Sequence, residues 1–338
     1  MKKAIALTLC VMMLLTFLAG CGGKQEESKP AGDAAAEEPI KIRLAHVVNE
    51  KDGFHIAAVK FKELVEERTN NRVQIEIFPN ATLGDERTLL EGMQMATIDM
   101  GVITNGPVAN FLPEIAVFEM PFLFSSGEEA YKILDGPIGE LLLDKLETVN
   151  LKGLAYAERG FRNLTNSKRP VHTPADVEGL KIRVMENPVY IDTFKALGAN
   201  TVPMAWTEAL TALQQGTIDG QENPVNVIHS FKLHETQKHL SMTRHTYAPA
   251  LFVMSLKKFK ELPEDVQQVF IEAAQEAAEH ERKVNAENEQ KQLEDLKNWG
   301  MEIIQPDLEP FKEAVKPVYD KYGDKFGEYL NKIQKELE

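Results

Sequence analysis

Histidine and cysteine are the side chains of this sequence whose types and spacing could support catalysis or metal binding. His229, His234 and His239 recur every five residues, and His234-Glu235 matches the start of a zinc-protease motif. On a helix, five residues rotate each side chain by about 140° from the one before, so the three rings do not share a face. The second histidine also comes one position too late for the zinc motif. We therefore interpret this segment as a solvated, partly amphipathic helix without a metal.

Other catalytic patterns are missing from the sequence as well. It contains neither a Gly-x-Ser-x-Gly turn nor a glycine-rich phosphate loop. The two cysteines, Cys10 and Cys21, both fall near the N-terminus, so no disulfide is expected. Acidic residues number 52 against 38 basic ones, and the formal net charge of −14 argues against nucleic acid as a partner. We predict that the protein is not an enzyme and uses no cofactor.

The first twenty residues have the pattern of an export signal. Lys2 and Lys3 precede an apolar run over residues 4–18, shorter than the roughly 20 residues that a membrane-spanning helix needs. The run ends in Leu-Ala-Gly-Cys21, which resembles the lipobox of bacterial lipoproteins, where the cysteine carries diacylglycerol. We predict a signal peptide at 1–20 and lipidation of Cys21. The alternative is an ordinary cleaved signal peptide.

A segment without large apolar side chains follows the predicted signal. Residues 21–39 are rich in Gly, Ala, Glu, Lys and Pro, and such a segment buries too little apolar surface to offset its ordering entropy. We predict a flexible tether that connects a lipid anchor in the cell membrane to a folded domain over residues 40–338. The sequence leaves open whether the anchored protein faces a periplasm or an outer cell surface.

From residue 40 onward, the sequence alternates between strand and helix patterns. Ile40, Ile42 and Leu44 alternate with basic residues, as in a half-buried strand. Together with the patterns that follow, this predicts strand, helix and strand over 40–44, 54–65 and 73–77. A second region predicts the same order over 180–184, 190–197 and 201–203. Two such βαβ regions indicate an α/β fold.

Two helix-to-strand junctions share a local sequence pattern. Residues 90–101 read LEGMQMATIDMG and residues 210–220 read LTALQQGTIDG, each with a glutamine three positions before Thr-Ile-Asp. The simplest interpretation is two similarly built α/β lobes. Because ligands of open α/β sheets bind at the carboxyl ends of the strands, two facing lobes would place such ends on both walls of a cleft.

Longer motifs carry a resemblance to a known family. Gly-Leu-Lys-Ile-Arg-Val at 179–184 and Asp-Gly-Gln-Glu-Asn-Pro at 219–224, with Leu-Gly-Asp-Glu-Arg at 83–87, resemble the DctP-type solute-binding subunit of tripartite ATP-independent periplasmic (TRAP) transporters. The resemblance covers the mature chain. It implies a two-lobed periplasmic-binding-protein-like fold, with a hinge and a long helix that spans both lobes. We place the first lobe at about 40–157 plus a later return segment, the second at about 158–250, and helices at 263–338 across both.

The resemblance also implies which residues hold a ligand carboxylate. Arg183 takes the place of the principal carboxylate-clamping arginine, Asn223 that of an amide that binds the same group, and Arg162 that of a second arginine. A planar guanidinium matches a carboxylate with paired donors, and hydrogen bonds to charged groups contribute roughly 1.5–3 kcal/mol each. Arg159 and Arg169 are close in the sequence and compete with Arg162 for its role.

Further residues match positions that vary with the substrate in such subunits. Trp206 occupies the place of an aromatic residue that packs on the ligand, although it could equally be a core residue. Other polar or aromatic candidates, each as readily structural, are His46, Thr104, Asn105, Asn187 and Tyr247. Glu86 matches an acid that binds ligand hydroxyls, and an acid would repel a second carboxylate. We therefore expect a hydroxylated monocarboxylate such as a uronic or aldonic acid, with a C4-dicarboxylate as the alternative and an extracytoplasmic enzyme as a distant one.

Overall fold

The computed structural model describes residues 38–338, which form one compact unit. The predicted signal peptide, Cys21 and nearly all of the predicted tether lie outside the described residues, so these assignments remain predictions. Among the described helices, none is both long and apolar enough to cross a membrane.

Strands and helices alternate along most of the chain. The strands are β1 (Ile40–Ala45), β2 (Val73–Phe78), β3 (Met100–Thr104), β4 (Leu151–Asn166), β5 (Lys181–Val184), β6 (Asn200–Pro203), β7 (Gly220–Asn223), β8 (His239–Ser255) and β9 (Glu302–Ile304). The α-helices are α1 (Gly53–Arg68), α2 (Glu86–Gln94), α3 (Asn105–Val108), α4 (Gly127–Leu134), α5 (Pro137–Lys145), α6 (Pro188–Ala196), α7 (Trp206–Gln215), α8 (Val225–Ser230), α9 (Leu256–Glu261), α10 (Glu264–Asn298), α11 (Glu309–Ala314) and α12 (Lys316–Leu337). Short 3₁₀ helices are η1 (Pro113–Glu119), η2 (Leu146–Val149), η3 (Pro174–Val177) and η4 (Leu233–Glu235).

Both predicted βαβ regions are present. In the first, the apolar positions that predicted a helix are the buried positions of α1, and Asp52 caps this helix by accepting the N–H of Phe54 at 3.1 Å. β1 pairs in parallel with both β2 and β3. In the second region, β5 pairs in parallel with β6 and β7. The predicted α/β class is therefore confirmed, with a first lobe that contains β1–β3 and a second that contains β5–β7.

Two long strands join the lobes. The sheet order is β2-β1-β3-β8-β4-β7-β5-β6, with β9 also paired to β8. β4 and β8 are antiparallel, and β8 pairs with β3 of the first lobe while β4 pairs with β7 of the second. Their mutual register shifts between Glu158 and Gly160 and again between Arg162 and Leu164. Gly160 has a φ of 103°, a conformation that L side chains rarely adopt, and it lies at one of these register shifts, where we expect the hinge.

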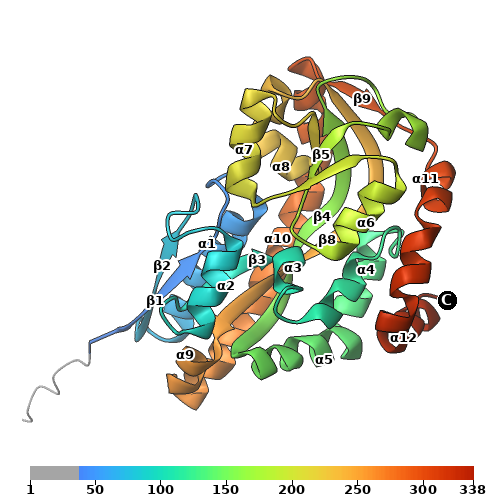
Figure 1. The fold of residues 1–338 in the computed structure, drawn as a ribbon. Helices are drawn as coiled ribbons and strands as arrows, with labels where there is room; N and C mark the ends of the chain where they lie inside the picture. Colours follow the sequence, from blue (N-terminus) through green and yellow to red (C-terminus); the bar gives the residue numbers. More distant parts are fainter. Residues whose placement is uncertain (1–37) are drawn as a thin grey trace, which may run out of the picture. The chain divides into compact units, whose positions relative to one another are not determined.

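One helix packs along both lobes. α10 has 35 residues, which corresponds to a length of about 50 Å. It packs against α1 of the first lobe, against β4 and against α8 of the second lobe (Figure 1). Its buried side includes Val266, Phe270, Ala273 and Ala277, while much of its C-terminal half is exposed. The predicted long helix across both lobes is therefore confirmed.

The repeated pattern at residues 90–101 and 210–220 adopts the same local structure in both copies. After α2 and α7 end, Ala96 and Gly216 take left-handed backbone conformations with φ of 57° and 66°. The hydroxyls of Thr97 and Thr217 then donate to the carbonyl five residues earlier, at 3.1 and 3.2 Å. The two turns match in backbone conformation and in side-chain contacts. The repeated sequence therefore encodes the same connection between a helix and the strand that follows it.

The aspartates of the repeat connect each turn to a neighbouring strand. Asp99 accepts the backbone N–H of Arg43 in β1, and Asp219 accepts that of Lys181 in β5, both at 2.9 Å. A glycine follows in each copy. A Cβ on Gly220 would lie 2.1 Å from the carbonyl oxygen of Thr165 in β4, so the approach of β7 to β4 requires glycine.

The expectation of a single helix through the three histidines is wrong. α8 ends at Ser230, Lys232 takes a left-handed conformation with φ of 51°, and β8 begins at His239. A left-handed residue interrupts helical hydrogen bonding, and the sequence pattern did not reveal it. The rings of His229 and His234 pack on the indole of Trp299. Within residues 38–338, no group of three or more potential ligand side chains is placed to bind a metal ion.

Candidate functional site

A narrow cavity with about 30 Å³ of water-accessible space lies between the two lobes. It lies near the carboxyl ends of strands from both lobes, where α/β folds place their ligands. Three of the predicted site residues, Glu86, Arg183 and Trp206, line it. The remaining lining residues are Val47, Asp85, Arg87, Pro107 and Asn110 from the first lobe and Met185, Glu186, Met204, Ala205 and Thr207 from the second.

Arg183 presents a buried positive charge to this cavity. Its side chain is on β5 and 3% exposed, and its Nε and Nη2 donate to the carbonyl oxygen of Met204 at 3.0 and 2.7 Å. Among residues 38–338, no carboxylate lies within ion-pair distance of the guanidinium. The pKa of Arg183 is lowered to about 10, mainly by burial. The positive charge of Arg162 also lowers this pKa, whereas the negative charges of Glu222 and Glu86 raise it. An unpaired buried charge is costly, so this position favours an anionic ligand.

Arg162 has a different environment. Its Nε and Nη2 both donate to the carboxylate of Glu222, with Nη2 at 2.8 Å, and Nη2 also donates to the carbonyl of Glu222 at 2.6 Å. His245 holds the same carboxylate through Nε2 at 3.2 Å and contacts Thr243 through Nδ1. Burial alone would raise the pKa of Glu222, but Arg162 and His245 together lower it. Glu222 therefore neutralises Arg162, and the sequence reading missed this partner although it directly precedes Asn223.

Asn223 ends β7 and is 4% exposed. Its Nδ2 donates to Gln221 Oε1 at 2.5 Å, and Gln221 in turn donates to Thr165 Oγ1 in β4 at 2.8 Å. This chain of side-chain hydrogen bonds fixes the orientation of the amide. Contact between Asn223 and a ligand remains a prediction, as it does for Arg162.

Glu86 lines the same cavity as Arg183, from the first lobe. It is the first residue of α2, and its Oε1 accepts the backbone N–H of Thr104 at 2.6 Å. Burial raises the pKa of Glu86, and Thr104, Arg159 and Arg183 oppose this effect. Thr104 interacts with Glu86 through its side chain as well as its backbone N–H, and both interactions lower the pKa of Glu86. The predicted contact of the Thr104 side chain with a ligand remains a prediction.

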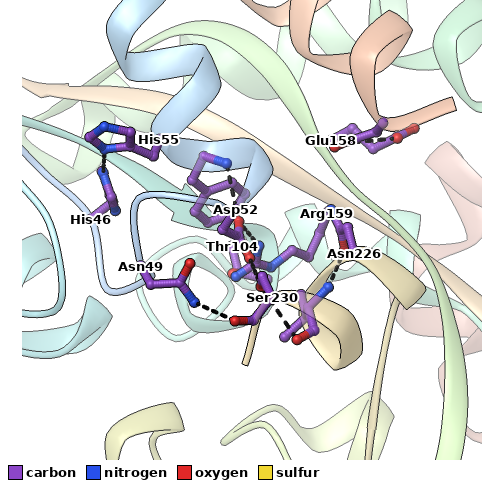
Figure 2. Close-up of polar contacts among 12 residues, drawn as sticks. His46, Asn49, Asp52, His55, Thr104, Glu158, Arg159, Asn226 and Ser230 are labelled. Atoms are coloured by element: carbon purple, nitrogen blue, oxygen red, sulfur yellow. Dashed lines mark hydrogen bonds and ion pairs between the residues drawn. The ribbon is translucent and has the colours of Figure 1, made fainter. Parts of the chain in front are cut away.

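Figure 2 shows Arg159 beside its ion-pair partner Asp52. Its Nη1 donates to Asp52 Oδ1 at 2.6 Å, and its guanidinium lies 3.9 Å from the ring centre of Phe54. It contributes to the pKa shifts of both Glu86 and His46. Sequence reasoning treated Arg159 only as a competitor of Arg162, because nothing in the sequence indicates that Asp52 neutralises it.

His46 lies in the wall of the first lobe and is fully buried. Its Nε2 lies 3.1 Å from Nδ1 of His55 in α1 (Figure 2). Burial, with His55 and Arg159, lowers the pKa of His46 to about 3, so the ring is neutral at physiological pH. A neutral imidazole can orient a hydroxyl but adds no charge to bind an anion.

Two of the predicted amides have structural partners, Asn187 across the lobes and Asn105 within the first lobe. Asn187 caps α6 by accepting the N–H of Val189 at 2.8 Å, and its Nδ2 donates across to Gly106 in α3 at 3.2 Å. Asn105 is fully buried, and its Nδ2 donates to the carbonyl of Ile115 at 3.2 Å. Both amides therefore have structural roles in this conformation, and their predicted ligand contacts remain predictions.

The two predicted aromatic residues face different surroundings. Trp206 begins α7, and its ring lies 5.6 Å from the guanidinium carbon of Arg183 and packs edge-on against Phe231. Tyr247 donates its hydroxyl to Glu158 at 3.1 Å, in a cluster near the hinge. Trp206 therefore lines the Arg183 cavity, whereas Tyr247 is not among its lining residues.

A second, wider cavity lies beside the hinge. Its lining includes Glu158, Arg159, Phe161 and Asn285, but not Arg183. Three carboxylates and two arginines line it, and Arg159 is already paired with Asp52. Arg244, the other arginine of this cavity, also has no carboxylate partner among the described residues, but it is only half-buried, whereas Arg183 is 3% exposed. The first cavity is the better anion site because its unpaired arginine is buried. Arg169 lies outside both cavities and donates to the carbonyls of Asp176 and Glu178.

The fold and the site define a class of protein: a two-lobed α/β binding protein with a buried, unneutralised arginine at the interface of its lobes. The sequence profile of the DctP family, bacterial extracellular solute-binding protein family 7, matches residues 44–325. The chain belongs to this family, and the predicted kinship with TRAP solute-binding proteins is confirmed.

Similar proteins and solved structures match this chain over most of its length. The 2,3-diketo-L-gulonate-binding periplasmic protein of Escherichia coli is 42% identical over 275 residues, which are 81% of this chain and 84% of that protein. A TRAP solute-binding protein from Polaromonas, solved with D-erythronate, is 41% identical with a TM-score of 0.86, covering 87% of this chain and 98% of that one. One from Citrobacter koseri, solved with D-glucuronate, is 33% identical with a TM-score of 0.83, over 87% and 98%.

Proposed function

We propose that this protein captures a hydroxylated monocarboxylate, an aldonic, uronic or related sugar acid, between its lobes and delivers it to the membrane permease of a TRAP transporter. The observation that carries the proposal is the buried guanidinium of Arg183, which has no carboxylate partner among residues 38–338 and lines the same cavity as Glu86. Arg183 supplies the charge for one carboxylate, and Glu86 accepts hydrogen bonds from hydroxyl groups.

Charge compensation within the site favours one carboxylate over two. Glu222 neutralises Arg162 and Asp52 neutralises Arg159, so Arg183 is the cation of this cluster that the described residues leave without an ion pair. A C4-dicarboxylate would bring a second charge next to Glu86, and burying an uncompensated charge costs several kcal/mol. The relatives solved with D-erythronate and D-glucuronate, and the relative named for 2,3-diketo-L-gulonate, are consistent with this choice.

Closure of the two lobes would complete the site. A ligand that contacts Arg183 in the second lobe and Glu86 in the first favours the closed conformation by the difference in its affinity for the two states. The crossing of β4 and β8 at Gly160 is the hinge of this motion. Lipidation of Cys21 would keep the protein at the membrane that holds the permease. Family membership favours this transport role over the enzyme alternative.

A thermal-shift screen of the purified protein tests the proposal. The compounds are D-erythronate, D-glucuronate and D-galactonate, with succinate and malate as C4-dicarboxylates and acetate as an acid without hydroxyls. A ligand at 100 times its dissociation constant should stabilise the native state by roughly 2.7 kcal/mol. We expect stabilisation by at least one sugar acid and none by acetate. Stabilisation by the dicarboxylates alone would replace the proposed ligand class.

A further inference from the structure

Glu119 is a buried acid at the junction of the two lobes. It ends η1 and is 1% exposed. Its Oε2 accepts from Nδ2 of Asn187 in the second lobe at 2.7 Å. Within residues 38–338, no cation lies within ion-pair distance of this carboxyl, and its Oε1 receives no hydrogen bond. A buried carboxyl without a cation partner favours its protonated form.

The groups around Glu119 come from several elements. Arg162 of β4 is the neighbouring cation, but its Nε and Nη2 donate to Glu222 of β7. The side chains of Asn105 and Tyr190 approach the same carboxyl. From the other packed elements, His245 of β8 contacts Glu222, and Tyr319 of α12 donates to the carbonyl of Pro121.

These surroundings place the titration of Glu119 near neutral pH. Burial raises the pKa of Glu119 to about 8, with Arg162 opposing the shift and Glu222 adding to it. His245 is buried and its pKa is lowered, mainly by burial, so its ring is neutral in this range. The charge of Glu119 therefore changes near this pH.

The charges near the carboxylate site can be counted. Arg162 and Arg183 carry two positive charges, and Glu222 and ionised Glu86 carry two negative charges. With Glu119 protonated, the empty cluster is neutral, and the ligand carboxylate adds one negative charge next to Arg183. With Glu119 ionised, the empty cluster already carries one negative charge, and the ligand carboxylate adds a second. Ionised Glu119 and a bound anion therefore oppose each other.

We propose that capture of the ligand carboxylate is coupled to the binding of one proton by Glu119, so that the occupied protein holds the acid together with that proton. The proton comes from solvent, adds to a carboxylate oxygen of Glu119 and returns to solvent when the ligand leaves. Coupling of this kind is reciprocal, so protonation of Glu119 strengthens ligand binding by the same factor. This inference rests on the proposed function, because it requires an anionic ligand at Arg183.

Calorimetry in two buffers measures the coupling directly in the wild-type protein. D-glucuronate and D-erythronate are titrated at pH 8 in phosphate and in Tris, which differ strongly in ionisation enthalpy. Proton uptake makes the apparent binding enthalpy depend on the buffer, and we expect up to about half a proton per ligand, because a group with a pKa of about 8 is already half protonated in the empty protein at pH 8. The same enthalpy in both buffers, with clear binding, would overturn the inference and leave the proposed function intact. Failure of both sugar acids to bind would overturn both.

Affinity as a function of pH assigns the proton to Glu119. Between pH 6.5 and 8.5, the wild-type affinity should fall by about fourfold in total, mostly above pH 7.5, because a group with a pKa of about 8 is still protonated at the acidic end of this range. The range ends at 8.5 because burial lowers the pKa of Arg183 to about 10. In Glu119→Gln, an amide replaces the titrating group, and the affinity should not change with pH.

Glu86→Gln is the matched control, because Glu86 is also a partly buried acid near the site and its pKa is raised. This variant should bind sugar acids more weakly but keep the pH dependence of the wild type. A flat profile for Glu86→Gln, with an unchanged slope for Glu119→Gln, would move the coupled proton to Glu86 and overturn the assignment. The buffer experiment on the wild type does not depend on the folding of either variant.

Discussion

At the scale of single residues, the arginines near the site differ in whether a carboxylate lies within ion-pair distance. Arg159 and Arg162 form close ion pairs with Asp52 and Glu222, whereas Arg183 has hydrogen bonds only to the neutral carbonyl of Met204. Paired arginines shape the site and keep it electrically balanced. An unpaired one provides the charge that binds a ligand.

Replacement of Arg183 by alanine should therefore abolish high-affinity binding. Two hydrogen bonds to a charged group contribute about 3–6 kcal/mol, so the dissociation constant should rise at least about 100-fold. Calorimetry with the sugar acid that stabilises the wild type measures the loss. Arg72→Ala is a suitable control, because Arg72 pairs with Asp265 on the surface and should leave the affinity unchanged. Wild-type affinity in Arg183→Ala would show that another residue holds the carboxylate.

At the scale of elements, the repeated turn after α2 and α7 carries a testable asymmetry. Ala96 and Gly216 occupy equivalent left-handed positions, but glycine adopts this conformation without the steric cost that alanine has. The two lobes thus form the same turn, but the backbone is strained at Ala96 and unstrained at Gly216.

Exchanging these residues should change stability in opposite directions. Ala96→Gly is expected to raise the free energy of unfolding by about 0.5–1 kcal/mol, and Gly216→Ala to lower it by a similar amount. No atom lies within 4 Å of a Cβ placed on Gly216, so the loss there would reflect backbone strain alone. Urea unfolding of both variants gives the two values. Changes of the same sign would contradict the equivalence of the two turns.

At the scale of the whole molecule, a buried pair of carboxyls connects α10 to β4: Glu281 belongs to α10 and Glu158 to β4. The backbone N–H of Glu158 in β4 donates to Oε2 of Glu281 in α10 at 2.9 Å, and Asn285 donates to Oε1 of Glu281 at 2.7 Å. Tyr131 and Tyr247 donate to Glu158. Burial raises the pKa of both carboxyls, and each one raises the cost of ionising the other.

This pair predicts how stability depends on pH. A carboxyl whose folded pKa is raised binds more protons in the native state than in the unfolded chain, whose pKa is near 4.3. The free energy of unfolding should therefore fall as pH rises above this value toward the raised pKa. Glu281→Gln should vary less between pH 5 and 8 and be more stable than the wild type at pH 8. Urea unfolding across this range measures the slopes.

Glu287→Gln serves as the control for this prediction. Glu287 is exposed on the same helix, where it faces Lys283 at 4.0 Å, so its replacement should leave the pH slope unchanged. If Glu281→Gln kept the wild-type slope, the buried pair would not be the source of the pH dependence.

Much of the fold could be predicted from local patterns. The alternation of apolar residues in β1 and β2 and the helical spacing in α1 follow from burial of one face, which is a property of neighbouring residues. The break at Lys232 could not be predicted in this way, because the left-handed residue there belongs to a type that usually avoids it. In the site, Glu86, Arg183 and Trp206 were predicted residues that do line one cavity.

The sequence by itself determined the α/β class, the two matching turns, the long helix and the family, because these depend on short-range periodicity and on motifs of adjacent residues. Only the tertiary structure decided which arginine is free to bind an anion. Asp52 is 107 positions from Arg159, and Glu222 is 60 positions from Arg162. The electrostatic interaction that neutralises an arginine depends on the distance between the two charges in space and weakens as that distance grows. The number of residues between the two charges in the sequence does not determine this distance. The same reason explains why the sequence did not single out Glu119, whose buried position between η1 and Asn187 depends on the tertiary structure.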